Sequence, residues 1–95
     1  MLNLERAKDL RRRGMDREAE TLLQALIDRE EGEAAGKGVE HWYYEHLAAL
    51  YHERGDDGAE IEILERYGRQ QPASEAMAAM MAQRLETAQR KADSR

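Results

Sequence analysis

The sequence predicts an all-α domain built from two antiparallel helical hairpins and a C-terminal capping helix. Three observations lead to this prediction. In most of the chain, apolar residues recur every three to four positions, as they do on one face of a helix. Two glycines, Gly14 and Gly55, each stand between two such patterns, where a helix can end in the left-handed conformation. Asp16, an aspartate after Gly55, and Ser74 stand just before the second, fourth and fifth helical patterns, at positions suited to capping a helix.

Length and composition describe a single small domain, residues 1–95. Leu, Ile, Val and Phe together number only 14 of the 95 residues, a proportion typical of disordered chains. However, the apolar residues keep helical spacing, and a net charge of -5 is small for a chain with 37% charged residues. We therefore expect a folded domain.

The composition also predicts the environment of the protein. The chain has no Cys, so it has neither disulfides nor thiolate metal ligands, which favours the reducing cytoplasm. Its N-terminal stretch lacks the apolar run of a signal peptide. No segment approaches the roughly 20 apolar residues of a membrane span, so we expect a soluble protein without membrane contact.

The first hairpin is predicted at residues 3–31. Its first helix, residues 3–13, ends at Gly14. Apolar residues lie on one side of this helix: Leu4, Ala7 and Leu10. Asp16 then caps a second helix. The apolar stripe of the second helix consists of Ala19, Leu22, Leu23, Leu26 and Ile27.

A connector follows where this pattern fades after Ile27. We expect residues 28–34 to be a solvated acidic segment, because residues 18–34 carry a net charge of -5. Residues 32–38 contain three glycines and are predicted to be flexible.

The second hairpin is predicted at residues 39–72 and ends at Pro72. Its inward faces are formed by Tyr43, Tyr44, Leu47, Ala48, Leu50 and Tyr51, and by Ala59, Ile63, Leu64 and Tyr67. The turn contains an aspartate cap with Glu60 three residues later, a capping-box spacing. Because Gly14 and Gly55 should adopt positive φ, we expect valine at Gly55 to destabilise more than valine at Gly36 in the connector.

The capping helix is predicted at residues 73–92, with Ser74 as its cap. One face of this helix carries Met77, Met80, Met81 and Leu85. We expect this methionine face to pack on the second hairpin as part of the core.

The two hairpins share a pattern with each other. Ala7, Leu10, Gly14, Ala19, Leu23 and Leu26 have the spacing of Ala48, Tyr51, Gly55, Glu60, Leu64 and Tyr67. The pattern resembles the tetratricopeptide repeat, a helix-turn-helix unit of about 34 residues. The chain departs from it at Glu60, where a small residue is expected, at Arg6, where an apolar one is, and in the Gly14 to Gly55 spacing of 41.

A second resemblance is confined to residues 42–70, WYYEHLAALYHERGDDGAEIEILERYGRQ. This stretch is similar to helical segments at the C-terminal ends of uncharacterised bacterial proteins, some of which carry a DNA-binding HIRAN domain upstream. The resemblance implies that the module can be one part of a larger protein.

The repeat resemblance implies a short right-handed α-solenoid in which the first helix of each repeat lines a concave groove. The groove positions that it implies are Leu4, Lys8, Arg11 and Arg12 in the first repeat, and Trp42, Glu45, Ala49, His52 and Glu53 in the second. The helical wheel independently places the second set on the side away from Leu47 and Tyr51.

Other chemistry is disfavoured. His41 and Glu45 have the i, i+4 spacing of two metal ligands, but His46 points elsewhere and His52 lies about 10 Å beyond Glu45 along the helix axis. The glycines lack phosphate-loop spacing, and the serines lack the partners of a nucleophile. We therefore predict no metal, no cofactor and no enzyme.

The predicted function is that of a protein-protein interaction adaptor, which binds a peptide or helix in the groove. The alternative is an accessory helical module of a nucleic-acid-handling protein, although the net acidity disfavours direct nucleic-acid binding. A homodimer is a further expectation, with Trp42 in its interface. In that dimer the basic first helix would face an acidic stretch of the other copy: Glu30, Glu31 and Glu33.

Overall fold

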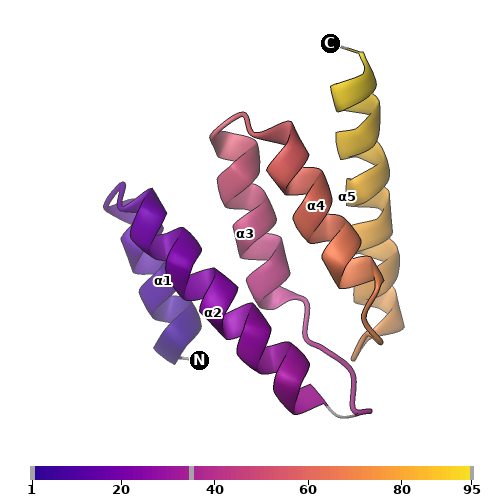
Figure 1. Ribbon diagram of the computed structural model, residues 1–95, viewed down its shortest axis with the longest axis horizontal. Helices are drawn as coiled ribbons and strands as arrows, with labels where there is room; N and C mark the ends of the chain where they lie inside the picture. Colours follow the sequence, from indigo (N-terminus) through magenta and orange to yellow (C-terminus); the bar gives the residue numbers. More distant parts are fainter. Residues whose placement is uncertain (1, 35, 95) are drawn as a thin grey trace.

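The computed structural model describes residues 2–34 and 36–94, and five α-helices make up most of this part of the chain (Figure 1). They are α1 (Leu2–Arg12), α2 (Asp16–Ala34), α3 (Trp42–Glu53), α4 (Asp57–Gly68) and α5 (Glu75–Asp93). Each helix packs against the next one in the chain, and α1 also contacts α3. The all-α prediction with two hairpins and a fifth helix is confirmed.

The turn of the first hairpin forms as predicted at Gly14, whose φ is 75°. The backbone N–H of Met15 donates to the carbonyl of Leu10 at 2.9 Å, which closes the end of α1. Asp16, however, does not precede α2 as its cap. It is the first residue of the helix, where its charge favourably meets the positive end of the helix dipole.

The turn of the second hairpin has the same form, with Gly55 at a φ of 75°. Asp56 is the cap of α4, because its side chain accepts a hydrogen bond from the N–H of Ala59 at 3.1 Å. The capping box predicted with Glu60 is therefore wrong. Glu60 lies one turn further on and is turned inward, with an exposed fraction of only 4%.

The helix α2 continues well past the predicted end of its apolar stripe, to Ala34. Residues 28–34 are thus helical rather than a solvated acidic connector. Two kinds of contact account for this. Arg29 pairs with Glu33 one turn later at 3.0 Å, and Glu31 accepts hydrogen bonds from α3 and α4.

Directly after the predicted connector, Val39 joins the chain to the segment before α5. Val39 is 2% exposed and pairs with Pro72 in an isolated parallel β-bridge. The N–H of Val39 donates to the carbonyl of Gln71 at 2.8 Å, and the N–H of Ala73 donates to the carbonyl of Val39 at 3.0 Å. The bridge joins the entrance of α3 to the segment before α5.

The glycines of the connector correct one prediction. Gly36 has a φ of 86°, and a Cβ there would meet no atom within 4 Å, as is also true of Gly55. The structure therefore gives no reason to expect that valine at Gly55 destabilises the fold more than valine at Gly36 does. Gly38 is the constrained position, because its φ is 88° and a Cβ would lie 2.7 Å from backbone atoms of Pro72 and Ala73.

The core lies along α3, between the two hairpins. Leu47, Tyr51 and Leu64, which were predicted to face inward in the second hairpin, are buried with exposed fractions of 0, 5 and 2%. Tyr44 and Tyr67 pack edge to face with ring centroids 5.2 Å apart.

The fifth helix covers α4 and begins at the predicted cap, where the hydroxyl of Ser74 accepts from the N–H of Met77 at 3.3 Å. Met81 and Ala88 are its buried residues. The predicted methionine face is wrong at Met80, which is 39% exposed.

Candidate interaction groove

Arg11 connects α1 to α3 and organises the first part of the candidate site. Its Nη1 lies 3.2 Å from Nδ1 of His46, and its Nη2 donates to Glu53 at 2.5 Å. Because a guanidinium can only donate, Nδ1 of His46 accepts and the neutral imidazole carries its proton on Nε2. Burial and the nearby charge of Arg11 lower the pKa of His46, which keeps the ring neutral.

Four of the predicted groove residues meet beside this contact. Lys8, Arg11, Arg12 and Glu53 line a depression of about 360 Å³ between α1 and α3. Lys8 and Arg12 otherwise make only long surface pairs within α1, to Glu5 at 3.5 Å and to Asp9 at 3.6 Å. Their ammonium and guanidinium groups thus stay available at the surface.

A second depression of about 220 Å³ lies between α3, α4 and α5. Its lining contains one predicted residue, His52, whose Nδ1 is 3.2 Å from the buried carboxylate of Glu60. The remaining residues were missed by sequence reasoning: Glu60, Arg84, Thr87, Ala88 and Lys91. For Glu60, the one signal in the sequence was that it stands where the repeat pattern expects a small residue. Arg84 and Lys91 belong to the fifth helix, which was predicted to cap the second hairpin and not to line the groove.

The other predicted residues do not line either depression. Trp42 is half-buried at the start of α3, with its ring 5.6 Å from that of His41. Glu45 and Ala49 are half-buried on the same helix. Leu4 is 3% exposed and belongs to the interior, so its placement in the groove was wrong.

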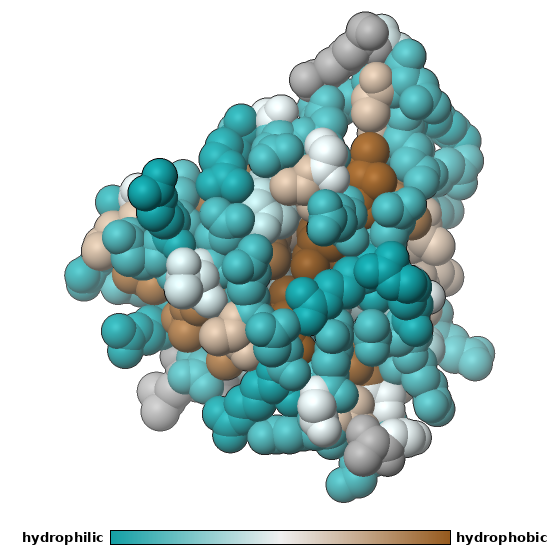
Figure 2. Space-filling view, in the orientation of Figure 1, coloured by the Kyte–Doolittle hydropathy of each residue, from teal (hydrophilic) through white to brown (hydrophobic). Residues whose placement is uncertain are grey.

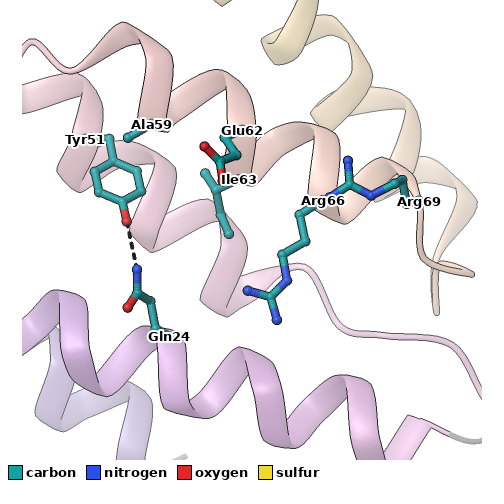
Figure 3. A pocket seen from close by; sticks show the side chains of 7 residues that line it. All are labelled: Gln24, Tyr51, Ala59, Glu62, Ile63, Arg66 and Arg69. Carbon is teal, nitrogen blue, oxygen red and sulfur yellow. Dashed lines mark hydrogen bonds between the residues drawn. The ribbon is translucent and has the colours of Figure 1, made fainter.

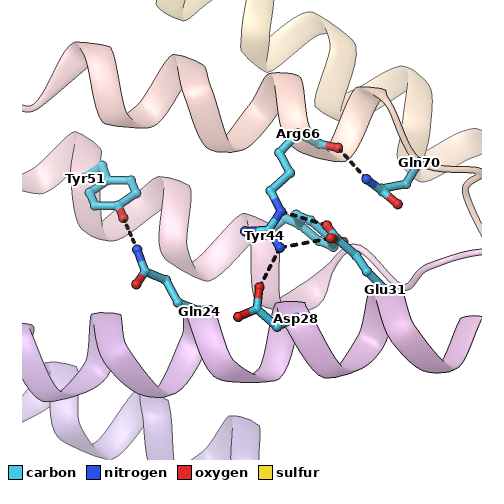
Figure 4. A network of polar contacts seen from close by, with 7 residues as sticks. All are labelled: Gln24, Asp28, Glu31, Tyr44, Tyr51, Arg66 and Gln70. Carbon is cyan, nitrogen blue, oxygen red and sulfur yellow. Dashed lines mark hydrogen bonds and ion pairs between the residues drawn. The ribbon is translucent and has the colours of Figure 1, made fainter.

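The side of the molecule formed by α2 and α4 is occupied by an internal network (Figure 4). Arg66 on α4 donates to Glu31 at 2.8 Å and to Asp28 at 2.7 Å, and the hydroxyl of Tyr44 also donates to Glu31, at 2.9 Å. Hydrogen bonds to the two carboxylates raise the pKa of Arg66, and burial and the bond to Glu31 raise the pKa of Tyr44. The network fastens the first hairpin to the second.

The acidic stretch proposed to face a second copy is also engaged within the chain. Glu30 accepts from the backbone N–H of Glu40 at 2.9 Å, and Glu33 pairs with Arg29. With Glu31 held by Arg66, these carboxylates serve the fold of one copy.

A small pocket of about 140 Å³ lies on the same side (Figure 3). The phenol of Tyr51 donates to Glu20 at 2.8 Å and accepts from Gln24 at 3.2 Å. Burial and the bond to Glu20 raise the pKa of Tyr51 to about 12. Ligand pockets usually hold about 300 Å³ or more, so this pocket, like the 220 Å³ depression taken by itself, is too small for a typical small-molecule ligand. In the view of Figure 2, hydrophobic residues show as small patches and a central seam between hydrophilic ones.

Among residues 2–34 and 36–94, no group of three or more His, Asp or Glu side chains is placed to hold a metal ion. No helix in this described part combines the length and hydropathy of a membrane-spanning segment.

Comparison with known proteins identifies no relative. The chain matches no protein-family model, no curated protein and no solved structure. The geometry of the odd-numbered helices is therefore the basis for a functional proposal.

Proposed function

We propose that the chain is a non-catalytic interaction module that binds an acidic peptide or helix across α1, α3 and α5. The observation that carries this proposal is the gathering of cations along the two depressions, in a chain whose net charge is -5. These cations are Lys8, Arg11 and Arg12 from α1, and Arg84 and Lys91 from α5.

The arrangement suits an elongated ligand better than a small molecule. Both depressions include residues of α3: the first lies between α3 and α1, and the second lies between α3, α4 and α5. Consecutive packing of the helices supports a repeat-like array, in which the odd-numbered helices present one continuous surface. Glutamates or aspartates of a helical ligand would pair with the cations, and His46 and Glu53 would keep Arg11 in place.

Isothermal titration calorimetry provides the test, because Trp42, the single tryptophan, lies outside the two depressions. We expect a saturable heat change on titration with a synthetic helical peptide that carries a leucine stripe and glutamates at i and i+4. The same peptide with lysines in place of glutamates should not bind. Reversing two exposed charges, Lys8→Glu with Arg12→Glu, should weaken binding by about tenfold or more.

The matched control is Arg69→Glu, which reverses a charge on the α4 side and should leave the affinity unchanged. Equal affinities of the Lys8→Glu, Arg12→Glu variant and the unmodified protein would show that the depressions are not the binding surface. Absence of binding to the glutamate peptide at millimolar concentration would count against an acidic ligand altogether.

Nucleic acid is the alternative ligand, because the same cations can meet phosphates. Two carboxylates, Glu53 and Glu60, line the depressions beside these cations, and they would repel a continuous row of phosphates more than a peptide whose carboxylates are spaced apart. Titration with a single-stranded oligonucleotide in increasing salt separates the two proposals. Binding that falls steeply with salt, together with indifference to the glutamate peptide, would favour the accessory module of a nucleic-acid-handling protein.

A further inference from the structure

The first hairpin carries a groove whose lining, among the described residues, comes from α1, α2 and the turn between them. It has a volume of about 660 Å³ and runs between α1 and α2. Leu10, Met15, Leu22 and Ala25 supply its apolar lining. Met15, one of these residues, is 39% exposed.

A regular stripe of residues begins at Met15, just before α2, and continues along α2. Their spacing alternates between three and four residues, as on one side of a helix that packs against another helix. The stripe consists of Met15, Glu18, Leu22, Ala25, Arg29 and Gly32. All of these are exposed except Leu22, which is half-buried.

The stripe is complementary to itself when it is read in opposite directions. Its centre lies midway between Leu22 and Ala25, and two residues equally far from the centre have opposite charge or complementary size. Glu18 has its counterpart in Arg29, of opposite charge. Met15 has its counterpart in Gly32, where a Cβ would meet nothing within 4 Å and a bulky neighbour has room.

We propose that two copies of this chain pair through this face, with α2 packed antiparallel on α2 about a two-fold axis. Leu22 of each copy then lies on Ala25 of the other, and small residues let the helices approach closely. Glu18 of each copy meets Arg29 of the other, so the charge pair forms twice. Such an isologous contact is closed, because each face is used completely within the pair.

The local contacts of the single chain do not oppose this pairing. Arg29 now pairs with Glu33 at 3.0 Å, but both side chains are about two-thirds exposed, and surface pairs of this kind exchange at little cost. The pairing uses the outward side of α1 and α2, whereas Lys8, Arg11 and Arg12 line the depression toward α3. The proposed dimer therefore does not depend on the proposed acidic ligand, and it leaves the depression between α1 and α3 free to bind that ligand.

Sedimentation equilibrium of charge-reversed variants tests the pairing. The unmodified chain, of 10.9 kDa, should sediment with twice that mass at high micromolar concentration. Glu18→Arg and Arg29→Glu, made singly, each place two like-charge contacts in the interface and should raise the dimer dissociation constant by about tenfold or more. The double reversal restores both pairs and should recover the dimer. Glu65→Arg, an exposed change on α4, is the control and should have no effect.

Cross-linking tests the register, because the chain contains no cysteine of its own. The variant with Met15→Cys and Gly32→Cys places one thiol just before α2 and the other 17 residues later within α2, about 26 Å away along the helix axis and too far to join within a copy. Mild oxidation should link two copies. Each single variant should stay unlinked, since its thiols would lie at opposite ends of the pair.

Three results would overturn the proposal. The first is a mass of 10.9 kDa for the unmodified chain at several hundred micromolar. The second is a dimer that neither charge reversal weakens. The third is a series of ever larger oligomers, which would assign the face to a head-to-tail contact. Circular dichroism spectra equal to that of the unmodified chain would exclude misfolding of the variants as the cause.

Discussion

Replacing Gly38 with alanine tests how firmly the connector is joined to the segment before α5. The φ of 88° at this position costs an alanine roughly 1–2 kcal/mol, because its Cβ crowds the following carbonyl. The Cβ would also lie 2.7 Å from the carbonyl carbon and oxygen of Pro72 and from the nitrogen of Ala73. These are backbone atoms, so the chain itself has to move apart.

The movement would strain or break the bridge that Val39 makes with this segment. Its two hydrogen bonds contribute roughly 0.5–1.5 kcal/mol each. Together with the backbone term, Gly38→Ala should lower the free energy of unfolding by about 2–5 kcal/mol. That is a large share of the roughly 5–15 kcal/mol that stabilises a domain.

Two other glycines in the same segment are matched controls. Gly36 has a similar φ of 86° but open space around a Cβ, so Gly36→Ala should cost only the backbone term of about 1–2 kcal/mol. Gly32 is helical with open space, so Gly32→Ala should stabilise by roughly 0.5–1 kcal/mol.

Urea unfolding followed by circular dichroism measures all three variants. In a domain of this size, about 1 kcal/mol corresponds to a change of about 4–8 °C in Tm, so thermal unfolding should rank them in the same order. Equal losses for Gly38→Ala and Gly36→Ala would refute the reasoning, since they would mean that the close approach to Pro72 carries no cost.

Two more predictions concern the core and the contact between α1 and α3. Leu64→Ala should lower the free energy of unfolding by about 2–5 kcal/mol, because Leu64 is 2% exposed, whereas Met80→Ala at a 39% exposed site should change it little. An unchanged Tm for Leu64→Ala would contradict the assignment of the inward face. The pKa of His46 is lowered in the fold, so its contribution to stability is complete above the unfolded value near 6.5 and is lost as the pH falls through the folded value. His46→Gln should therefore flatten the decrease of stability as the pH falls below about 6.5, and an identical pH profile would exclude the imidazole as its source.

Long-range contacts explain where sequence reasoning failed about the site. Lys8, Arg11 and Arg12 were predicted to share a surface with Glu53, and they line one depression. The contribution of α5 was not predicted, because the spacing of Arg84 and Lys91 within their own helix says nothing about which side of α3 they reach. Glu60 was noted as an oddity, but only the packed structure shows its contact with His52.

What the sequence by itself determined is local. Helical periodicity identified the inward faces, and the glycines at positions 14 and 55 located the turns of both hairpins, because these features depend on backbone preferences within a few residues. The tertiary structure decided what lies further apart along the chain. Arg66, 35 residues beyond Glu31, holds the polar end of α2, and the pairing of Val39 with Pro72 fixes the connector. Polar segments lack the regular spacing of apolar residues from which a helix can be predicted. Their structure depends on hydrogen bonds and ion pairs with residues that are distant in the sequence.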